Sequence, residues 1–543
     1  MTKRVDVDVA DEQPGTFAVH AASHHPRHAG PVTFTRRWWL ASLASWSGVT
    51  AVVAVSWLIR AIGIDRNYDI FIDEVTYTRI ADNLASGHGL MLYGAPFDLH
   101  PPAAFALYAL AIKLLGLHGT IGNLLFGLRP LVALVGSITC AMEFLLVSEI
   151  SKWGFGGVVV AVIASLDPFE IFYDSHVMLE APAQLASVLA ILLLAKSLHS
   201  QSERRSWTLV LLSGIAAGFA MCTKEYFGLA LGLTLLLSLI SGWITERRKV
   251  GTALAVMCVC YFLSESLVIA TSGFQPWWNQ STSGLRRLIG SEQITGFNSR
   301  AVNVSLESKL IADAGHFGVT YLILGLGAVA GILQVITVIR HRTDWLSSAQ
   351  PADRGRVLVA LWSVAGTAYL VYATLIGTIE EQMYYLLFTP SLCTLILAVS
   401  SVRPRLAVHW RKIAVALLGA VIVADSAVWA GVHQRPDDEY RQLLSWAPKH
   451  LPEGSTVAVT EDTAQFILQG VVIGDWATVP ALIEHHVDYV LLSTTLVSQG
   501  YGLAKPNLEQ YLQAHATVAF RATGPSEGAL VLYNVRAITG ARI

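Results

Sequence analysis

The sequence predicts a polytopic α-helical membrane protein with a small α/β domain at its carboxyl end. Three observations predict it: 53% of the 543 residues are hydrophobic, only 14% are charged, and apolar stretches of membrane-spanning length recur before residue 432. Soluble domains carry about 25% charged residues, so this chain lacks the charge that a solvated surface needs. The composition excludes a cytosolic enzyme, a disordered scaffold and a nucleic-acid binder. A net charge of −2 indicates no bulk electrostatic partner.

Apolar segments are long enough to cross a bilayer at about 11 places. A helix that crosses the bilayer core requires about 20 mostly apolar residues. The segments span approximately residues 38–59, 123–147, 155–172, 177–198, 207–222, 226–243, 250–271, 318–339, 357–378, 384–400 and 412–431. We interpret residues 36–431 as one membrane-embedded domain.

The two ends of the chain differ from this apolar middle. Residues 1–35 are polar and contain several histidines, which predicts a disordered tail. Residues 432–543 alternate short β-branched runs with helical stretches, which predicts a small α/β domain. The runs are Thr456–Thr460, Tyr489–Ser493, Thr517–Phe520 and Leu530–Tyr533, and the helical stretches include Asp438–Trp446 and Asn507–His515.

The distribution of Lys and Arg between spans predicts the orientation. The connections on one side carry basic clusters such as Arg247, Arg248 and Lys249, whereas the other side has two long loops, about 60–122 and 272–317. Cytoplasmic loops carry the excess of Lys and Arg. We therefore expect a cytoplasmic amino terminus, and an odd number of spans places the C-terminal domain outside.

The first long loop holds the strongest cluster of chemically active residues. Asp73 and Glu74 are adjacent, Tyr77 follows one turn later, and His100 precedes a Pro-Pro pair. Neighbouring residues on a helix point about 100° apart, so one carboxylate can face a substrate while the other holds the loop. The apolar spacing from Val75 onward suits a helix lying on the membrane surface. An acidic pair after a span is also a common helix N-cap.

This loop resembles that of the GT-C glycosyltransferases, specifically the protein O-mannosyltransferase and lipid A aminoarabinose transferase type. The matching residues, in order, are Asp73, Glu74, Tyr77, Gly87, Gly89, Pro101 and Pro102, with Arg129 and the Gly214–Ala220 and Thr223-Lys224 stretches further on. At the family's second acidic position, usually aspartate, this chain has Glu180 in Met-Leu-Glu-Ala-Pro. The resemblance implies a GT-C membrane fold and a polyprenyl-phosphate-linked sugar donor.

The chemistry of such a transfer, and the position of several residues at the outer ends of spans, predict roles for individual residues. Asp73 is the expected general base, with Glu74 and Glu180 completing the catalytic group. The donor phosphate is expected at Arg129, Lys224, Tyr384 and Tyr385, and the acceptor or sugar at Tyr77, His100 and Glu381. No metal and no cofactor are expected, because Arg or Lys can neutralise a single lipid-borne phosphate.

Purely structural roles remain open as alternatives for several of these residues. Lys224 and Arg129 can be basic side chains that snorkel to the membrane interface. Tyr384 and Tyr385 fit an interfacial aromatic belt, and His100 can cap a helix. The pair Trp277-Trp278 suits either the interface or stacking against a sugar.

The combined prediction is an inverting glycosyltransferase of the bacterial plasma membrane, acting on its outer face. Its partners would be the bilayer, the lipid-linked donor and a glycan, lipid or protein acceptor, without nucleic acid. The alternative is a transporter or flippase, which requires charges midway through several spans and pseudo-symmetric halves. Few ionisable residues lie in mid-span, namely Glu143, Glu265 and Asp425. A non-catalytic sensor would leave the Asp73 cluster unexplained.

Overall fold

The computed structural model describes residues 36–151, 154–292, 304–402, 408–459, 463–500 and 506–540. The predicted disordered tail, 1–35, and part of the second long loop, 293–303, lie outside these residues. The chain divides into two compact units, 1–47 and 48–543, and the second contains both the helical bundle and the C-terminal sheet. The predicted boundary at residue 432 therefore stays a prediction.

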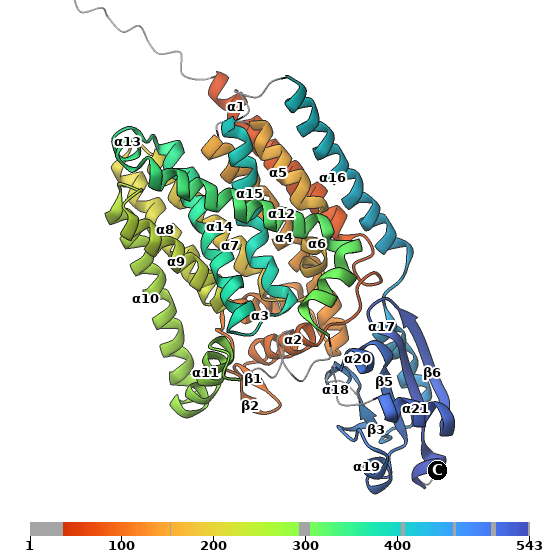
Figure 1. The fold of residues 1–543 in the computed structure, drawn as a ribbon. Helices are drawn as coiled ribbons and strands as arrows, with labels where there is room; N and C mark the ends of the chain where they lie inside the picture. The colour runs from red at the N-terminus through yellow and green to blue at the C-terminus, as the bar shows by residue number, and fades with distance from the viewer. Residues whose placement is uncertain are drawn as a thin grey trace, which may run out of the picture. The chain divides into compact units, whose positions relative to one another are not determined.

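A bundle of long helices makes up most of the second unit (Figure 1). Its helices are α1 (Arg36–Ala61), α4 (Ile121–Ser151), α5 (Gly154–Leu166), α6 (Pro168–Asp174), α7 (Glu180–His199), α8 (Glu203–Met221), α9 (Glu225–Ser241), α10 (Arg247–Ser272), α12 (Leu306–Arg340), α13 (Arg342–Ser348), α14 (Pro351–Leu375), α15 (Tyr385–Val402) and α16 (Val408–Gln434). Each predicted apolar segment coincides with one of these helices or, for 155–172, with the α5–α6 pair. The predicted polytopic fold is confirmed.

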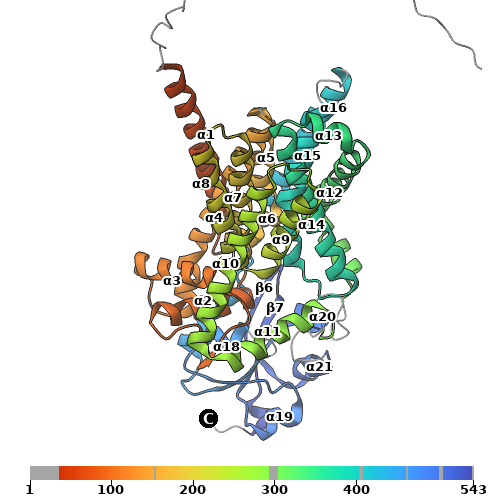
Figure 2. The same ribbon diagram turned by 90° about the vertical axis from the view of Figure 1, so that its left-hand side faces the viewer.

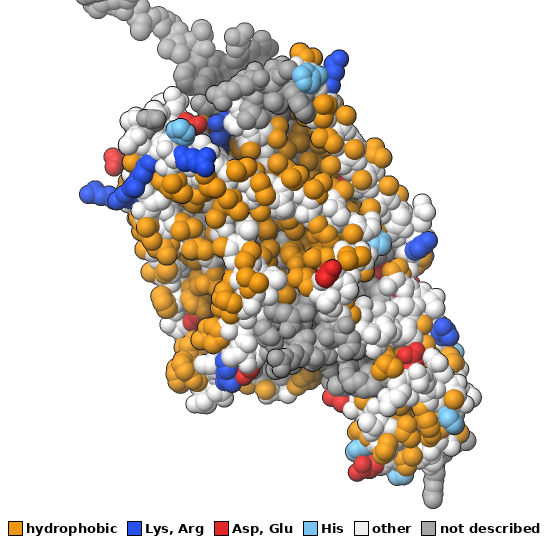
Figure 3. Space-filling model, in the orientation of Figure 1, with side chains coloured by type: hydrophobic (Ala, Val, Ile, Leu, Met, Phe, Trp, Pro, Cys, Tyr) orange, Lys and Arg blue, Asp and Glu red, His pale blue; other side chains and the backbone are white. Residues whose placement is uncertain are grey.

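Seven helices of the described residues are long and apolar enough to cross a membrane, or eight if the bent α5–α6 pair is one span. This pair bends by 62° at Asp167. The Asp167 carboxylate accepts hydrogen bonds from the backbone N–H groups of Phe169 and Glu170, and Pro168 begins α6. Asp at the N-cap followed by Pro is a helix start signal, so the sequence itself sets the break. Figure 3 shows hydrophobic side chains over the bundle, with charges mainly at its ends.

Small residues bring α8 and α10 into close contact. A Cβ added to Gly214 would lie 2.8 Å from the carbonyl oxygen of Ala253, and one added to Gly218 would lie 2.5 Å from the Cβ of Cys260. Without side chains at these two positions, the helix backbones approach closely, as the small-xxx-small pattern predicts.

The connections α1–α4, α6–α7, α8–α9, α10–α12 and α14–α15 share one end of the bundle, because successive spans run in opposite directions. We call this the loop end. It carries α2 (Ile72–Ala85), β1 (Met91–Leu92), β2 (Ala95–Pro96), α3 (Ala103–Leu115), α11 (Phe274–Leu288) and the 3₁₀ helix η1 (Glu381–Tyr384). The surface helix predicted after Asp73 is α2, but Val75, Tyr77 and Ile80 are buried. They pack inside the protein, so α2 does not lie open to lipid as its spacing suggested.

The C-terminal region folds around a mixed five-stranded sheet in the order β4-β3-β5-β7-β6. β3 pairs in parallel with β4 and β5, while β7 pairs antiparallel with β5 and β6. The elements are α17 (Glu439–His450), β3 (Thr456–Val459), α18 (Thr463–Ile467), β4 (Val472–Gly474), α19 (Val479–Glu484), β5 (Tyr489–Ser493), α20 (Thr494–Gln499), α21 (Pro506–His515), β6 (Thr517–Gly524), β7 (Gly528–Asn534) and α22 (Arg536–Thr539). The predicted α/β character is confirmed, and β4 was missed.

Hydrogen bonds join this region to the first long loop. The backbone N–H of Tyr440 donates to both carboxylate oxygens of Asp69 at 3.2 Å. The backbone N–H of Asp437 donates to the carbonyl of Arg66, and its carboxylate accepts from Ser526 in the β6–β7 turn. The loop that leads into α2 is therefore fixed from its other side by the C-terminal region.

Candidate functional site

Glu74 and Arg129 form a buried ion pair at the start of α2. Both side chains are inaccessible to solvent. The guanidinium also donates to the carbonyls of Ile64, Tyr68 and Asp69, at 2.9, 2.9 and 3.0 Å. The five N–H groups of Arg129 are thus directed at protein acceptors. Arg129 was expected at the donor phosphate, but its donors are used in fixing the loop before α2, and we revise its role accordingly.

Glu74 connects three parts of the loop end. Besides Arg129, its carboxylate accepts from the backbone N–H of Val177, which precedes α7, at 3.0 Å and from that of Phe71 at 3.3 Å. The sequence predicted that Glu74 belongs to the catalytic group. Fully buried and saturated by these donors, Glu74 can act on a substrate only by holding α2 in place.

Asp73, one residue earlier, has the opposite surroundings. Its side chain is partly exposed, and with the residues that the structure describes it makes no hydrogen bond or ion pair. The pKa of Asp73 is raised to about 6, chiefly by burial; Lys224 opposes the shift, and the carboxylates of Glu380 and Glu180 contribute to it. A free carboxylate with a pKa near neutrality has the properties of a general base.

Lys224, the N-cap of α9, lies at the centre of a buried polar cluster. Its Nζ lies 3.4 Å from Oε1 of Glu180 and 3.4 Å from the hydroxyl of Tyr77. It also lies 5.7 Å from the ring centroid of Tyr77 and 5.6 Å from that of Tyr226. The hydroxyl of Tyr226 donates to the same Glu180 oxygen at 2.7 Å. Glu180 therefore pairs with Lys224 and positions it, and the ammonium group is held between two aromatic rings.

His100 joins this cluster from the loop before α3. Its Nε2 lies 3.5 Å from Nζ of Lys224, and its Nδ1 lies 3.5 Å from a carboxylate oxygen of Glu225. Burial, followed by the nearby ammonium, lowers the pKa of His100. The imidazole is then neutral near pH 7 and can accept or donate one hydrogen bond. The structure brings together Lys224, Glu180, Tyr77 and His100, which the sequence selected from four separate segments.

A second cation faces Asp73, and the sequence did not single it out. Arg287, in the last turn of α11, pairs with Glu380 at 3.2 Å, and both act electrostatically on the Asp73 carboxylate. Arg287 lies far along the chain from every matching motif. The only available signal was a basic pair, Arg286-Arg287, in the second long loop.

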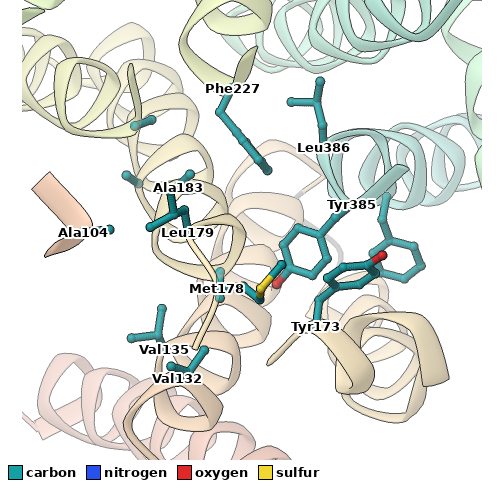
Figure 4. Close-up of a cluster of buried hydrophobic side chains, with 14 of the residues drawn as sticks. Ala104, Val132, Val135, Tyr173, Met178, Leu179, Ala183, Phe227, Tyr385 and Leu386 are labelled. Carbon is teal, nitrogen blue, oxygen red and sulfur yellow. The ribbon is translucent and has the colours of Figure 1, made fainter. Parts of the chain in front are cut away.

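Three predicted residues lie outside this group of contacts. Tyr385 points into the core beside Tyr173 and Met178 (Figure 4), where its hydroxyl donates to Asp174 at 2.6 Å. Tyr384 lies against Tyr321, with ring centroids 6.2 Å apart. Glu381 lies 3.6 Å from Lys309. Glu380, rather than its neighbour Glu381, acts on the Asp73 carboxylate. The hydroxyl of Tyr385 is buried and paired with Asp174, which argues against its contact with the donor phosphate. The assignments of Tyr384 and Glu381 stay predictions.

Among the described residues, no group of three or more His, Cys, Asp or Glu side chains is arranged to hold a metal ion. The expectation of metal-independent chemistry stays a prediction.

The fold and this site define the class of the protein. It is a polytopic membrane protein with a carboxylate, Asp73, and two cations, Lys224 and Arg287, at the loop end of its bundle.

The family model described as Dolichyl-phosphate-mannose-protein mannosyltransferase matches residues 50–271, which include α2, α3 and Lys224. No curated protein matches the chain.

Solved structures similar to this chain have the same architecture. The structure of ArnT from Cupriavidus metallidurans in the apo state has a TM-score of 0.57 at 15% identity, covering 92% of this chain and 100% of that one. The same protein bound to undecaprenyl phosphate has a TM-score of 0.55 at 14% identity, over 91% and 99%. The oligosaccharyltransferase AglB from Archaeoglobus fulgidus, in complex with an inhibitory peptide and a dolichol-phosphate, has a TM-score of 0.55 at 12% identity, over 91% and 74%.

These likenesses establish the fold. The chain is a multi-span membrane protein with the GT-C fold of the glycosyltransferases, and its resemblance to the protein O-mannosyltransferase and aminoarabinose transferase type is confirmed.

Proposed function

We propose that this protein is an inverting glycosyltransferase that moves a sugar from a polyprenyl-phosphate donor to an acceptor hydroxyl, with Asp73 as the general base. One observation carries the proposal: of the adjacent carboxylates, Asp73 alone is unpartnered, partly exposed and close enough to Lys224 for the ammonium to lower its pKa. The solved structure of ArnT with undecaprenyl phosphate and that of AglB with dolichol-phosphate support a lipid-phosphate donor.

The reaction needs a base and a group that stabilises negative charge. The acceptor oxygen attacks the anomeric carbon opposite the phosphate, and its proton passes to the Asp73 carboxylate. The bond between the anomeric carbon and the phosphate oxygen breaks, and the electron pair stays on the polyprenyl phosphate. A singly charged diester thereby becomes a monoester with one further negative charge, which cations placed beforehand stabilise in the transition state.

Lys224 and Arg287 are the cations that we assign to this charge. Each is paired with a carboxylate in the structure, Lys224 with Glu180 and Arg287 with Glu380, and each acts electrostatically on Asp73. Binding of the donor would exchange part of these contacts for contacts with the phosphate. We assign Tyr77 and His100, which both contact Lys224, to orienting the sugar or the acceptor.

The distribution of basic residues supports one orientation of the protein in the membrane. We propose a bacterial plasma membrane with the amino terminus inside, the loop end outside, and residues 432–543 as an extracytoplasmic domain. The donor would reach the site from the bilayer, and the glycan, lipid or protein acceptor from outside.

A transporter or flippase is the second candidate, and one observation favours it. Inside the bundle, Arg60 pairs with Asp174 at 2.7 Å, and Glu143 accepts a hydrogen bond from Thr389. Intramembrane ionisable residues often mark transport pathways. Here, however, the Arg60–Asp174 pair is completely enclosed.

Turnover of a lipid-linked donor separates the two candidates. We would reconstitute the protein with a panel of polyprenyl-phosphate sugars and quantify free polyprenyl phosphate by mass spectrometry, with and without cell-envelope glycan fractions as acceptor. Acceptor-dependent release that Asp73→Asn abolishes and Asp82→Asn, on the same helix, preserves supports the transferase. Translocation of intact donor without release would refute it.

A further inference from the structure

Four acidic side chains meet where the C-terminal region contacts the first long loop. They are Asp69 in the loop before α2, Asp437 and Glu439 at the start of α17, and Glu527 in the turn between β6 and β7. All four are buried, and the other three act electrostatically on the Asp69 carboxyl. In both views α18 lies next to α2, so the two regions meet at the loop end (Figures 1 and 2).

Two of these carboxyl groups are held by hydrogen-bond donors. The Asp69 carboxylate accepts from the backbone N–H of Ile70 at 2.8 Å and from that of Tyr440 at 3.2 Å. The Asp437 carboxylate accepts from the backbone N–H of Asp69 at 3.4 Å and from the N–H and hydroxyl of Ser526 at 2.9 and 2.7 Å. Such donors favour the ionised form of each group.

Glu439 differs from both, although it is completely buried. No hydrogen bond of ordinary length and angle reaches either of its carboxylate oxygens from the described residues. Its polar neighbours include the Asp69 carboxyl and the backbone N–H groups of Glu439 itself and Glu527. A Cβ on Gly524 of β6 would lie 2.2 Å from its Oε1, so the strand backbone closes over the carboxyl group. A buried carboxyl group without water or a counter-charge takes up a proton rather than stay ionised.

No cation in the described part of the chain compensates the pair of Asp69 and Glu439, since neither forms an ion pair there. The two basic side chains that contact Asp69 do so at its main-chain carbonyl. These are Arg129 at 3.0 Å and Nε2 of His176 at 3.1 Å. Arg129 is already paired with Glu74, and burial lowers the pKa of His176, which keeps its imidazole neutral near pH 7.

The electrostatics of Asp69 agree with this geometry. Burial, followed by the Glu439 carboxyl, raises the pKa of Asp69 well above its usual range. Tyr68, which interacts with Asp437, adds no charge, because burial raises its pKa as well. Two neighbouring carboxyl groups can hydrogen-bond to each other only when one of them carries a proton.

We infer that Glu439 and Asp69 share one proton, which makes their contact a pH-dependent latch between the C-terminal region and the loop that leads into α2. While the proton is present, one carboxyl O–H donates to the other carboxylate. Its loss at alkaline pH leaves two buried like charges side by side, which opens the latch. The stabilisation is therefore complete at acidic pH and is lost as the pH rises through the raised pKa. The latch does not depend on the proposed function; if that function holds, the latch also fixes α2 and thereby Asp73.

Hydrogen exchange in the parent and in one isosteric variant tests the latch. Glu439→Gln is neutral at every pH and keeps a donor for Asp69. The matched control is Glu453→Gln, an exposed glutamate of the same region. The full chain in nanodiscs would be labelled at pH 6 and at pH 9, and exchange of the backbone amides in residues 66–72 and 436–442 would be measured by mass spectrometry. Comparing the proteins at the same pH removes the pH dependence of the exchange chemistry itself.

At pH 9 we expect the parent and the control to exchange several-fold faster than Glu439→Gln in both segments, and at pH 6 we expect all three to exchange alike. Equal exchange of the parent and Glu439→Gln at pH 9 would overturn the inference. Faster exchange of Glu439→Gln at both pH values would also overturn it, because Glu439 would then act as an ionised acceptor. An infrared difference spectrum of the two proteins at pH 6 should show the C=O stretch of a protonated carboxylic acid in the parent, and its absence would refute the shared proton.

Sugar transfer provides a readout that rests on the proposed function. Parent turnover should fall several-fold between pH 7 and pH 9, whereas Glu439→Gln should retain it. An equal fall in both proteins would show that the latch does not act on the site. Absence of transfer at every pH would count against the proposed function, while the exchange measurement would still decide the latch.

Discussion

Asp73 and Glu74 are neighbours in α2, yet one carboxylate is free and the other is fully buried against Arg129. The helical rotation of about 100° between them separates a group available for chemistry from a group that fixes the helix. This separation predicts different consequences for the two corresponding amides.

Replacing Asp73 with Asn should abolish base catalysis and leave the fold intact. General bases contribute about 10²- to 10⁴-fold, and we expect a loss of kcat in that range. The melting temperature should be equal or higher, because a partly buried carboxylate with a raised pKa is replaced by a neutral group. The measurement is steady-state turnover in nanodiscs beside a thermal melt, with Asp82→Asn as control. Turnover within a few-fold of the parent would reassign the base.

The pH dependence of the parent follows from the same residue. The pKa of Asp73 is raised to about 6, and the base must be ionised, so activity is present above this pH and lost as pH falls through it. At pH 5 about one-tenth of the carboxyl groups are ionised, which predicts about a tenth of the plateau kcat/KM. A profile that stays flat from pH 7 to 5, with stability verified at each point, would argue against this assignment.

Glu74→Gln should act through stability. It leaves the buried Arg129 guanidinium without its counter-charge, which costs about 3–5 kcal/mol in comparable buried pairs. The single variants Glu74→Gln and Arg129→Met should each lower the melting temperature strongly, and the double variant by less than the sum of the two. Thermal melts of the parent, the two single variants and the double variant, all in detergent, complete this double-mutant cycle. Additive shifts would mean that the two side chains do not stabilise each other.

The sequence predicted the membrane fold well because its signals are local. Span length depends only on neighbouring residues. The break at Asp167-Pro168, inside the predicted segment 155–172, was not predicted, although its signal is also local. β4 was missed because a three-residue strand, Val472–Gly474, carries too little alternation to detect. The apolar spacing of α2 predicted a helix, but spacing alone does not distinguish lipid from protein as the partner of an apolar face.

Some residues of the site could be predicted from the sequence, and the others could not because their partners lie far away along the chain. The structure brings Tyr77, His100 and Glu180 into contact with Lys224, and the sequence had selected all four. Arg129 was assigned to phosphate because its partners, Glu74 and three backbone carbonyls, are recognisable only in three dimensions. Glu380 and Glu381 are adjacent, so only the path of the backbone decides which one faces Asp73.

The orientation is a separate prediction. A reporter active only in the periplasm should function when fused after residue 435, because the basic connections lie on the opposite side of the bundle. A reporter active only in the cytoplasm, fused after Lys249, should function as well. The reverse pattern in both fusions would place the loop end inside and remove lipid-linked donors of the outer leaflet from consideration.

Removing either cation at the site should weaken use of the donor more than use of the acceptor. Hydrogen bonds to charged groups contribute about 1.5–3 kcal/mol, so Lys224→Gln or Arg287→Gln should lower kcat/KM for the donor about 10- to 100-fold. The matched controls are Lys113→Gln in α3 and Arg286→Gln, whose side chain is half exposed and pairs with Glu292. Initial rates with donor and acceptor varied in turn measure the two constants. If Arg287→Gln and Arg286→Gln reduce donor use equally, Arg287 has no specific role at the phosphate. If Lys224→Gln affects both substrates alike, Lys224 serves to hold Tyr77, His100 and Glu180 in place rather than to bind the donor.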